Sequence, residues 1–164
     1  MEDIRNYLQM LIDGLQKKQK VLEDIQEIVQ EQAVILGAEE MDQTAFDNSM
    51  AKKADLIAQL EKLNDGFENV YDRVRDDLMV DKEKYREQIK ILQELIAVVS
   101  EKSIHIETME ERNKNKADNF FNLRRREIRS LRRSNTVANS YQQTMTGQAY
   151  LGTFDIESTI DRKN

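Results

Sequence analysis

The chain has 164 residues, of which 34% are charged, 39% apolar and only 6% aromatic, and it contains neither cysteine nor proline. The absence of cysteine excludes disulfides and thiolate chemistry, and the composition is typical of helical bundles and coiled coils within a single domain. The longest apolar run, residues 95–99, is far shorter than the roughly 20 residues of a membrane span, and the acidic start lacks the order of a signal peptide, so we expect a soluble cytoplasmic protein without membrane insertion.

The net charge of −6 conceals an asymmetry between the two halves of the chain. Residues 1–80 carry 9 basic against 18 acidic residues, a balance of −9, whereas residues 81–164 carry 16 against 13, a balance of +3. Within the second half, residues 112–133 hold nine bases and two acids. Because opposite charges attract, these halves favour either an antiparallel bundle or binding to other chains.

The first helix is predicted over residues 3–36, because its apolar residues recur at steps of three and four and therefore share one face. These residues are Ile4, Leu8, Leu11, Leu15, Leu22, Ile25, Val29 and Leu36. Lys18 and Gln32 fill the two polar positions in this stripe. Gly37 can take the left-handed conformation that closes a helix, whereas Gly14 is interpreted as a tolerated surface glycine that costs about 1 kcal/mol relative to alanine.

The second helix is predicted over residues 42–79, with Asp42 as the N-cap residue whose carboxylate accepts hydrogen bonds from free backbone amides. A second stripe begins in this helix and places one residue every seven along it and the next helix. Its members are Met50, Ile57, Asn64, Tyr71, Leu78, Tyr85, Leu92, Val99, Ile106, Asn113 and Phe120. The two asparagines, Asn64 and Asn113, either fix the packing register from buried positions or lie at the edge of the stripe.

The third helix is predicted over residues 82–146, after a tight turn near Val80 and Asp81, where the apolar stripe weakens. One continuous helix through this point is the alternative, because neither glycine nor proline interrupts it. Helices of that length are rare in ordinary domains, which favours the turn. The expected fold class is therefore all-α, an elongated antiparallel helical bundle or coiled coil of three long helices.

The last 31 residues, 134–164, differ in composition, since 14 of them are Ser, Thr, Asn or Gln. Beyond Gly147 the apolar residues lack a periodic face, so this segment cannot bury enough surface to offset its ordering entropy. We therefore expect a helical domain over residues 1–146 and a flexible C-terminal tail over residues 147–164 that becomes ordered with a partner.

The sequence does not indicate catalysis or metal binding. The single histidine, His105, has no acidic cluster at ligand spacing around it, and the chain has no glycine-rich phosphate loop. We therefore predict that the protein is not an enzyme and has no catalytic residue, no metal and no cofactor.

An arginine-rich run, residues 124–133, has four interpretations: nucleic-acid binding, lipid binding, for which its apolar face is thin, a solvated face, or a docking face for an acidic helix. Arginines neutralise phosphates, but the neighbouring aromatic residues are only Phe120 and Phe121, the pI is about 5.0, and no nucleic-acid module surrounds the run. A solvated face, or a docking face for an acidic helix, accounts for the run better. We predict no nucleic-acid partner.

Three features occur in a recognisable order. A leucine stripe in the first helix is followed by a second helix that contains Phe46, Lys52-Lys53-Ala54-Asp55-Leu56-Ile57, Leu60 and Leu63. The polar tail then closes with Ser158-Thr159-Ile160-Asp161-Arg162-Lys163-Asn164. Over essentially the full length, this order resembles the FlgN family of flagellar type III export chaperones. The family usually has a tyrosine and a final glycine in the closing motif, where Ile160 and Asn164 stand here.

The resemblance implies a cytoplasmic chaperone that binds the C-terminal regions of flagellar hook-associated proteins, prevents their premature assembly and delivers them to the export gate and its ATPase complex. The late helix and the tail would then bind the substrate protein. The candidate contacts are Leu123, Ile128, Leu131, Val137, Tyr141 and Met145. Possible docking residues for the export apparatus are Tyr150 and Phe154. Candidates for electrostatic steering are Arg125, Arg129 and Arg132.

A structural coiled-coil adaptor is the alternative function. Such a protein would use the same apolar stripes to oligomerise and would have no chaperone activity. The mass in solution discriminates between the two, and the sequence leaves both a monomer and a homodimer open.

Overall fold

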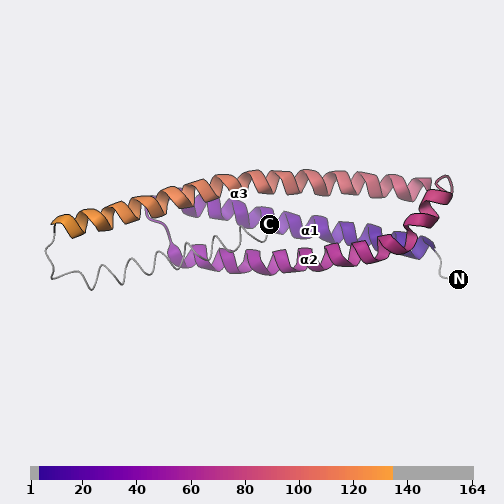
Figure 1. The fold of residues 1–164 in the computed structure, drawn as a ribbon, viewed down its shortest axis with the longest axis horizontal. Coiled ribbons are helices and arrows are strands. Elements are labelled where there is room, and N and C mark those ends of the chain that lie inside the picture. Colours follow the sequence, from indigo (N-terminus) through magenta and orange to yellow (C-terminus); the bar gives the residue numbers. More distant parts are fainter. Residues whose placement is uncertain (1–3, 135–164) are drawn as a thin grey trace. The chain divides into compact units, whose positions relative to one another are not determined.

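The computed structural model describes residues 4–134, and within this part of the chain it has three α-helices and no strand (Figure 1). α1 spans Ile4–Gly37, α2 spans Gln43–Val80 and α3 spans Arg86–Ser134. The three helices pack against one another through apolar residues, so the all-α prediction is confirmed.

The ends of the first two helices agree closely with the sequence prediction, which was 3–36 and 42–79 against the observed 4–37 and 43–80. The third helix was predicted to continue to residue 146. Its last predicted stretch, residues 135–146, lies outside the described residues, and so does the predicted tail, residues 147–164.

The chain divides into two compact units, each built from parts of the three helices. Among the described residues, the first unit comprises 4–30 and 52–109, and the second comprises 31–51 and 110–134.

One apolar cluster of the first unit surrounds the N-terminal half of α1. Leu8 and Leu11 are almost fully buried there, and they pack with Val74 and Leu78 of α2 and with Leu92 of α3. Burying a leucine of this kind contributes roughly 1.5–3 kcal/mol. This cluster joins the early part of α1 to the late part of α2 and the early part of α3.

A second cluster of the first unit surrounds the next turns of α1. Leu22 and Val29 of α1 are buried with Val99 and Ile106 of α3, and Leu60 of α2 packs against them. From the N-terminus of α1 onward, the residue numbers of its partners on α3 increase, whereas those of its partners on α2 decrease. Within this unit α1 and α3 run parallel, and α2 is antiparallel to both.

The turn between α2 and α3 was predicted correctly, but it is longer than expected. Residues 82–85 form the turn, so α3 begins at Arg86 rather than at residue 82. The Asp81 amide still donates to the Asp77 carbonyl oxygen at 3.2 Å, and the first regular bond of the new helix joins the Ile89 amide to the Tyr85 carbonyl oxygen at 2.9 Å. The chain must reverse direction before Tyr85 can enter the core, and residues 82–85 form this reversal.

The second unit has its own core. Leu36 of α1, Phe46 and Met50 of α2, and Ala117 and Phe121 of α3 are buried together in it. The chain enters α2 here through the predicted cap, because the Ala45 amide donates to Asp42 Oδ1 at 3.1 Å.

The predicted role of Gly37 is wrong. α1 does end at Gly37, but no glycine among the described residues has a positive φ. Instead, the Ala38 amide donates to the Ile35 carbonyl oxygen at 3.4 Å, a tighter three-residue turn that ends the helix without a left-handed residue.

The seven-residue stripe holds along most of α3 and then shifts. Tyr85, Leu92, Val99 and Ile106 are buried, as predicted, and Asn113, whose position was left open, is buried as well. The next members in sequence differ from the prediction, because Phe120 is only half-buried whereas Phe121 is 1% exposed. A straight helix drifts by about 20° per seven residues, so five repeats move the buried face by about one residue.

On α2 the same stripe lies nearer the surface. Asn64 is half-buried and Tyr71 is 39% exposed, so both occupy the edge of the apolar face. The edge interpretation therefore holds for Asn64, whereas Asn113 is buried within the second unit.

Replacing the cap of α2 tests how much this helix start stabilises the fold. We expect Asp42→Ala to lower the free energy of unfolding by about 1 kcal/mol, because the Ala45 amide loses its acceptor. Urea denaturation followed by circular dichroism measures the change. Glu40→Ala, an exposed acid in the same connection, is the control and should leave stability within about 0.5 kcal/mol of the parent. Equal effects of the two changes would contradict the capping role.

Candidate functional site

The candidate site is the part of α3 that follows its last buried residue, Phe121. Figure 1 shows this stretch in orange, continuing past the connection between α1 and α2. Residues 122–133 are exposed except for Arg125 and Ile128, which are half-buried. Helical structure persists here although the burial that supports it upstream has ended.

The apolar face of the second unit continues into this stretch. From Ala117 and Phe121, steps of three and four lead through Arg124 to Ile128 and Leu131. Ile128 is half-buried and Leu131 is 51% exposed. These two predicted contact residues therefore share the face that the core uses about two turns earlier.

Leu123 is placed differently from the other predicted contacts. It is 57% exposed, and its position two residues after Phe121 puts it to the side of the apolar face. Leu123 and Leu131 are eight residues apart, which places them about 80° apart around the helix axis, so Leu123 lies outside the face that Ile128 and Leu131 share. Among the described contact residues, Ile128 and Leu131 therefore share one face of the helix, and Leu123 lies outside it.

The three predicted steering arginines share one flank. Arg125, Arg129 and Arg132 follow one another at steps of four and three, beside Ile128. Arg125 Nη1 donates to the Asn122 side-chain oxygen at 3.3 Å, and Arg129 and Arg132 are exposed. The flank therefore presents a row of guanidinium groups.

Arg124 lies between Phe121 and Ile128 on the face itself. Its Nη1 is 3.0 Å from Glu127 Oε2, an ion pair within the helix between two exposed side chains. Exposed pairs of this kind contribute little to stability. Only Arg124 of this pair lies on the apolar face, because Glu127 is about 100° around the helix from Ile128.

The remaining predicted residues lie outside the described part of the chain. They are Val137, Tyr141 and Met145 among the substrate contacts, and Tyr150 and Phe154 among the docking residues. Their placement stays a prediction.

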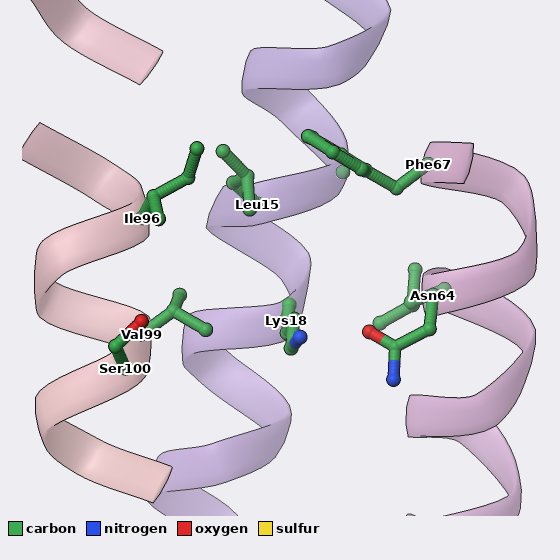
Figure 2. A pocket seen from close by; sticks show the side chains of 9 residues that line it. Leu15, Lys18, Asn64, Phe67, Ile96, Val99 and Ser100 are labelled. Carbon is green, nitrogen blue, oxygen red and sulfur yellow. The ribbon is translucent and has the colours of Figure 1, made fainter. Parts of the chain in front are cut away.

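The first unit contains a feature that sequence reasoning did not identify, a cavity of about 240 Å³ between the three helices. Gly14, Leu15 and Lys18 of α1 line it, together with residues of α2 and α3 (Figure 2). The other lining residues are Leu63, Asn64, Phe67, Ile96, Val99 and Ser100. Lys18 and Asn64 had each been noted as polar members of an apolar stripe, but only the packing of α1 against α2 brings them together.

The described helices lack the features of a membrane span and of a metal centre. None of them is both long and apolar enough to cross a bilayer. Among the described side chains, no group of three or more His, Cys, Asp or Glu is arranged to hold a metal ion.

Comparison with known proteins does not identify relatives. No protein-family model matches the chain, and neither curated proteins nor solved structures include a match.

The boundary between the core and the candidate site can be tested with two residues that lie two positions apart. We expect Phe121→Ala to lower the free energy of unfolding by about 3–5 kcal/mol, because it empties a buried position. Leu123→Ala should change it by less than about 0.5 kcal/mol, because that side chain is 57% exposed. Chemical denaturation of both variants gives the values. A similar loss for both would place the end of the core beyond Leu123.

Proposed function

We propose that this chain is a FlgN-type export chaperone, which acts in the cytoplasm and holds the C-terminal regions of flagellar hook-associated proteins. The proposal starts from the resemblance of its segment order and closing motif to that family. The observation that carries it furthest is the end of α3, where Ile128 and Leu131 extend the core face into exposed surface beside a row of arginines.

This end of α3 has the properties of a helix-binding surface. An amphipathic partner helix binds by covering apolar residues that share one helix face, as Phe121, Ile128 and Leu131 do at steps of seven and three. The partner would bury Leu131 and the exposed part of Ile128. Acidic residues along its edge would meet Arg125, Arg129 and Arg132.

The proposed order of events follows from these properties. Charge attraction brings the acidic edge of the substrate to the arginine flank, and apolar burial then holds it. A substrate segment covered in this way cannot pair with its neighbours in an assembly. In the proposal, Val137, Tyr141 and Met145 continue the contact with the substrate, and the tail residues Tyr150 and Phe154 contact the export gate and its ATPase complex.

Leu131→Asp tests the apolar part of the proposed surface. We expect binding of a labelled C-terminal fragment of a hook-associated protein to weaken tenfold or more, because an interface anchor contributes about 2 kcal/mol and a charge is placed where the partner is apolar. Fluorescence titration gives the affinity. Ile104→Asp is the matched control, because Ile104 is 64% exposed on the same helix but belongs to the first unit. Its affinity should equal that of the parent.

Truncation after Arg133 is the second arm of that titration. The described cores end at Phe121, so the melting temperature should stay unchanged while substrate binding is lost. If the truncated chain bound the fragment as tightly as the full chain, the late helix and tail would not be the substrate site. The mass in solution would then decide whether the chain is a structural coiled-coil adaptor.

The arginine flank is expected to act on the rate of association. Replacing both Arg125 and Arg132 with glutamate should slow association by about tenfold at low salt, with a smaller change in dissociation, because exposed charges steer encounters. High salt should reduce the difference, because the screening length falls to about 8 Å at physiological ionic strength. Stopped-flow mixing at several salt concentrations measures both rates. The same double change at Arg73 and Arg75 of α2 is the charge-matched control, and an equal slowing in it would attribute the effect to net charge alone.

A further inference from the structure

The cavity of the first unit combines apolar walls with three polar side chains. Leu15, Leu63, Phe67, Ile96 and Val99 supply the walls. The polar groups are the ammonium of Lys18, the amide of Asn64 and the hydroxyl of Ser100. An apolar pocket with a few convergent polar groups is the usual form of a small-molecule site.

Lys18 gives the cavity its charge. It is the only charged residue among the nine that line the cavity, and it is half-buried in the apolar stripe of α1. In Figure 2, Lys18 of α1 and Asn64 of α2 lie on either side of the space between the two helices, with the side-chain oxygen of Asn64 on the side that faces α1. Burial lowers the pKa of Lys18, because the apolar surroundings disfavour its charged form.

The acids nearest to Lys18 in sequence on the next turns of α1 are engaged elsewhere. Asp24 accepts from Lys20 at 3.0 Å, and Glu23 lies 3.6 Å from the Lys102 ammonium of α3. Among the described residues, neither Lys18 nor Asn64 has an ion pair or a hydrogen bond to another side chain. The Lys18 ammonium can therefore donate to an acceptor group of a bound molecule.

Gly14 forms part of the wall of the cavity and leaves room in it. A Cβ added at Gly14 would meet no atom within 4 Å. A cavity of about 150 Å³ suffices to hold benzene, so a volume of about 240 Å³ admits one ring or a short branched chain together with a small polar group.

We propose that this cavity binds a small organic acid, an apolar body of about one ring that carries a single carboxylate. The carboxylate accepts hydrogen bonds from the Lys18 ammonium and the Asn64 amide, while the body packs against Phe67 and Val99. This site is separate from the proposed chaperone surface, which lies in the second unit, and it stands whether or not that function is correct.

The test compares two probes that differ only in charge. Phenylacetate and its neutral analogue phenylacetamide are titrated into the full chain, and methyl and ring signals of the cavity residues are followed by NMR. We expect the acid to shift the signals of Phe67 and Val99 and to bind about tenfold more tightly than the amide, since charge-assisted hydrogen bonds are about twice as strong as neutral ones. Binding should also raise the pKa of Lys18, because a carboxylate favours the charged ammonium.

Two pairs of variants locate the site. Lys18→Met keeps the apolar stem and should reduce acid affinity to that of the amide, while Lys17→Met, an exposed neighbour with the same charge, should have no effect. Gly14→Leu should fill the cavity and abolish binding of both probes. Gly66→Leu, an exposed glycine of α2 that does not line the cavity, should bind like the parent.

Helix content and melting temperature establish that each variant is folded before it is titrated. Equal affinity for acid and amide in the parent, or unchanged acid affinity in Lys18→Met, would overturn the proposal. So would the absence of any signal change with phenylacetate at about 10 mM, a concentration that detects even millimolar affinities.

Discussion

Burial of the apolar stripe of α1 is the constraint on which the described structure depends. Each core cluster contains residues of α1, from Leu8 and Leu11 through Val29 to Leu36. The apolar residues of α2 and α3 are less deeply buried on average, since between Lys53 and Val74 no side chain of α2 is fully buried. An isolated helix is marginal in water, so the long helices persist because α1 supplies the surface that α2 and α3 cover. The two units use different parts of this one stripe.

Spacing in the sequence was sufficient to predict most of this architecture. Steps of three and four in the first helix, a cap at Asp42 and the weak point at Asp81 gave the correct number, order and approximate ends of the helices within the described part. The prediction is wrong at two places: where a small rotation of the helix face adds up over several repeats, and where the chain reverses direction between two helices. Phe121 replaces Phe120 in the core because helical drift adds up over five repeats, which no single window of sequence shows. α3 begins late because residues 82–85 are consumed in the reversal, and helix propensity does not report that demand.

The candidate site on α3 could be predicted only in part. Ile128 and Leu131 follow from the continuation of the stripe, and their exposure follows from the point at which α1 and α2 no longer cover that face. Leu123 was included because it is apolar, but its position on the helix separates it from the other two. Periodicity thus orders residues around a helix axis. It does not report where the covering helices end. The ends of those helices determine which residues of a stripe are exposed.

The two polar residues in the stripe of α1 show why packing partners, rather than residue type, decide what such a position does. Gln32 is 2% exposed, because its Nε2 donates to Ser49 Oγ at 3.0 Å and approaches Met50 Sδ at 3.1 Å, and Ser49 Oγ in turn donates to the Phe46 carbonyl oxygen. A buried amide with partners fixes the register of α1 against α2 in the second unit. Lys18 occupies an equivalent position fourteen residues earlier, yet α2 presents Asn64 and Phe67 there, and a cavity remains instead of a closed contact. An unpaired ammonium resists burial, which accounts for the space that remains around it. The same stripe therefore yields a sealed polar contact at Gln32 and an open, cationic pocket at Lys18.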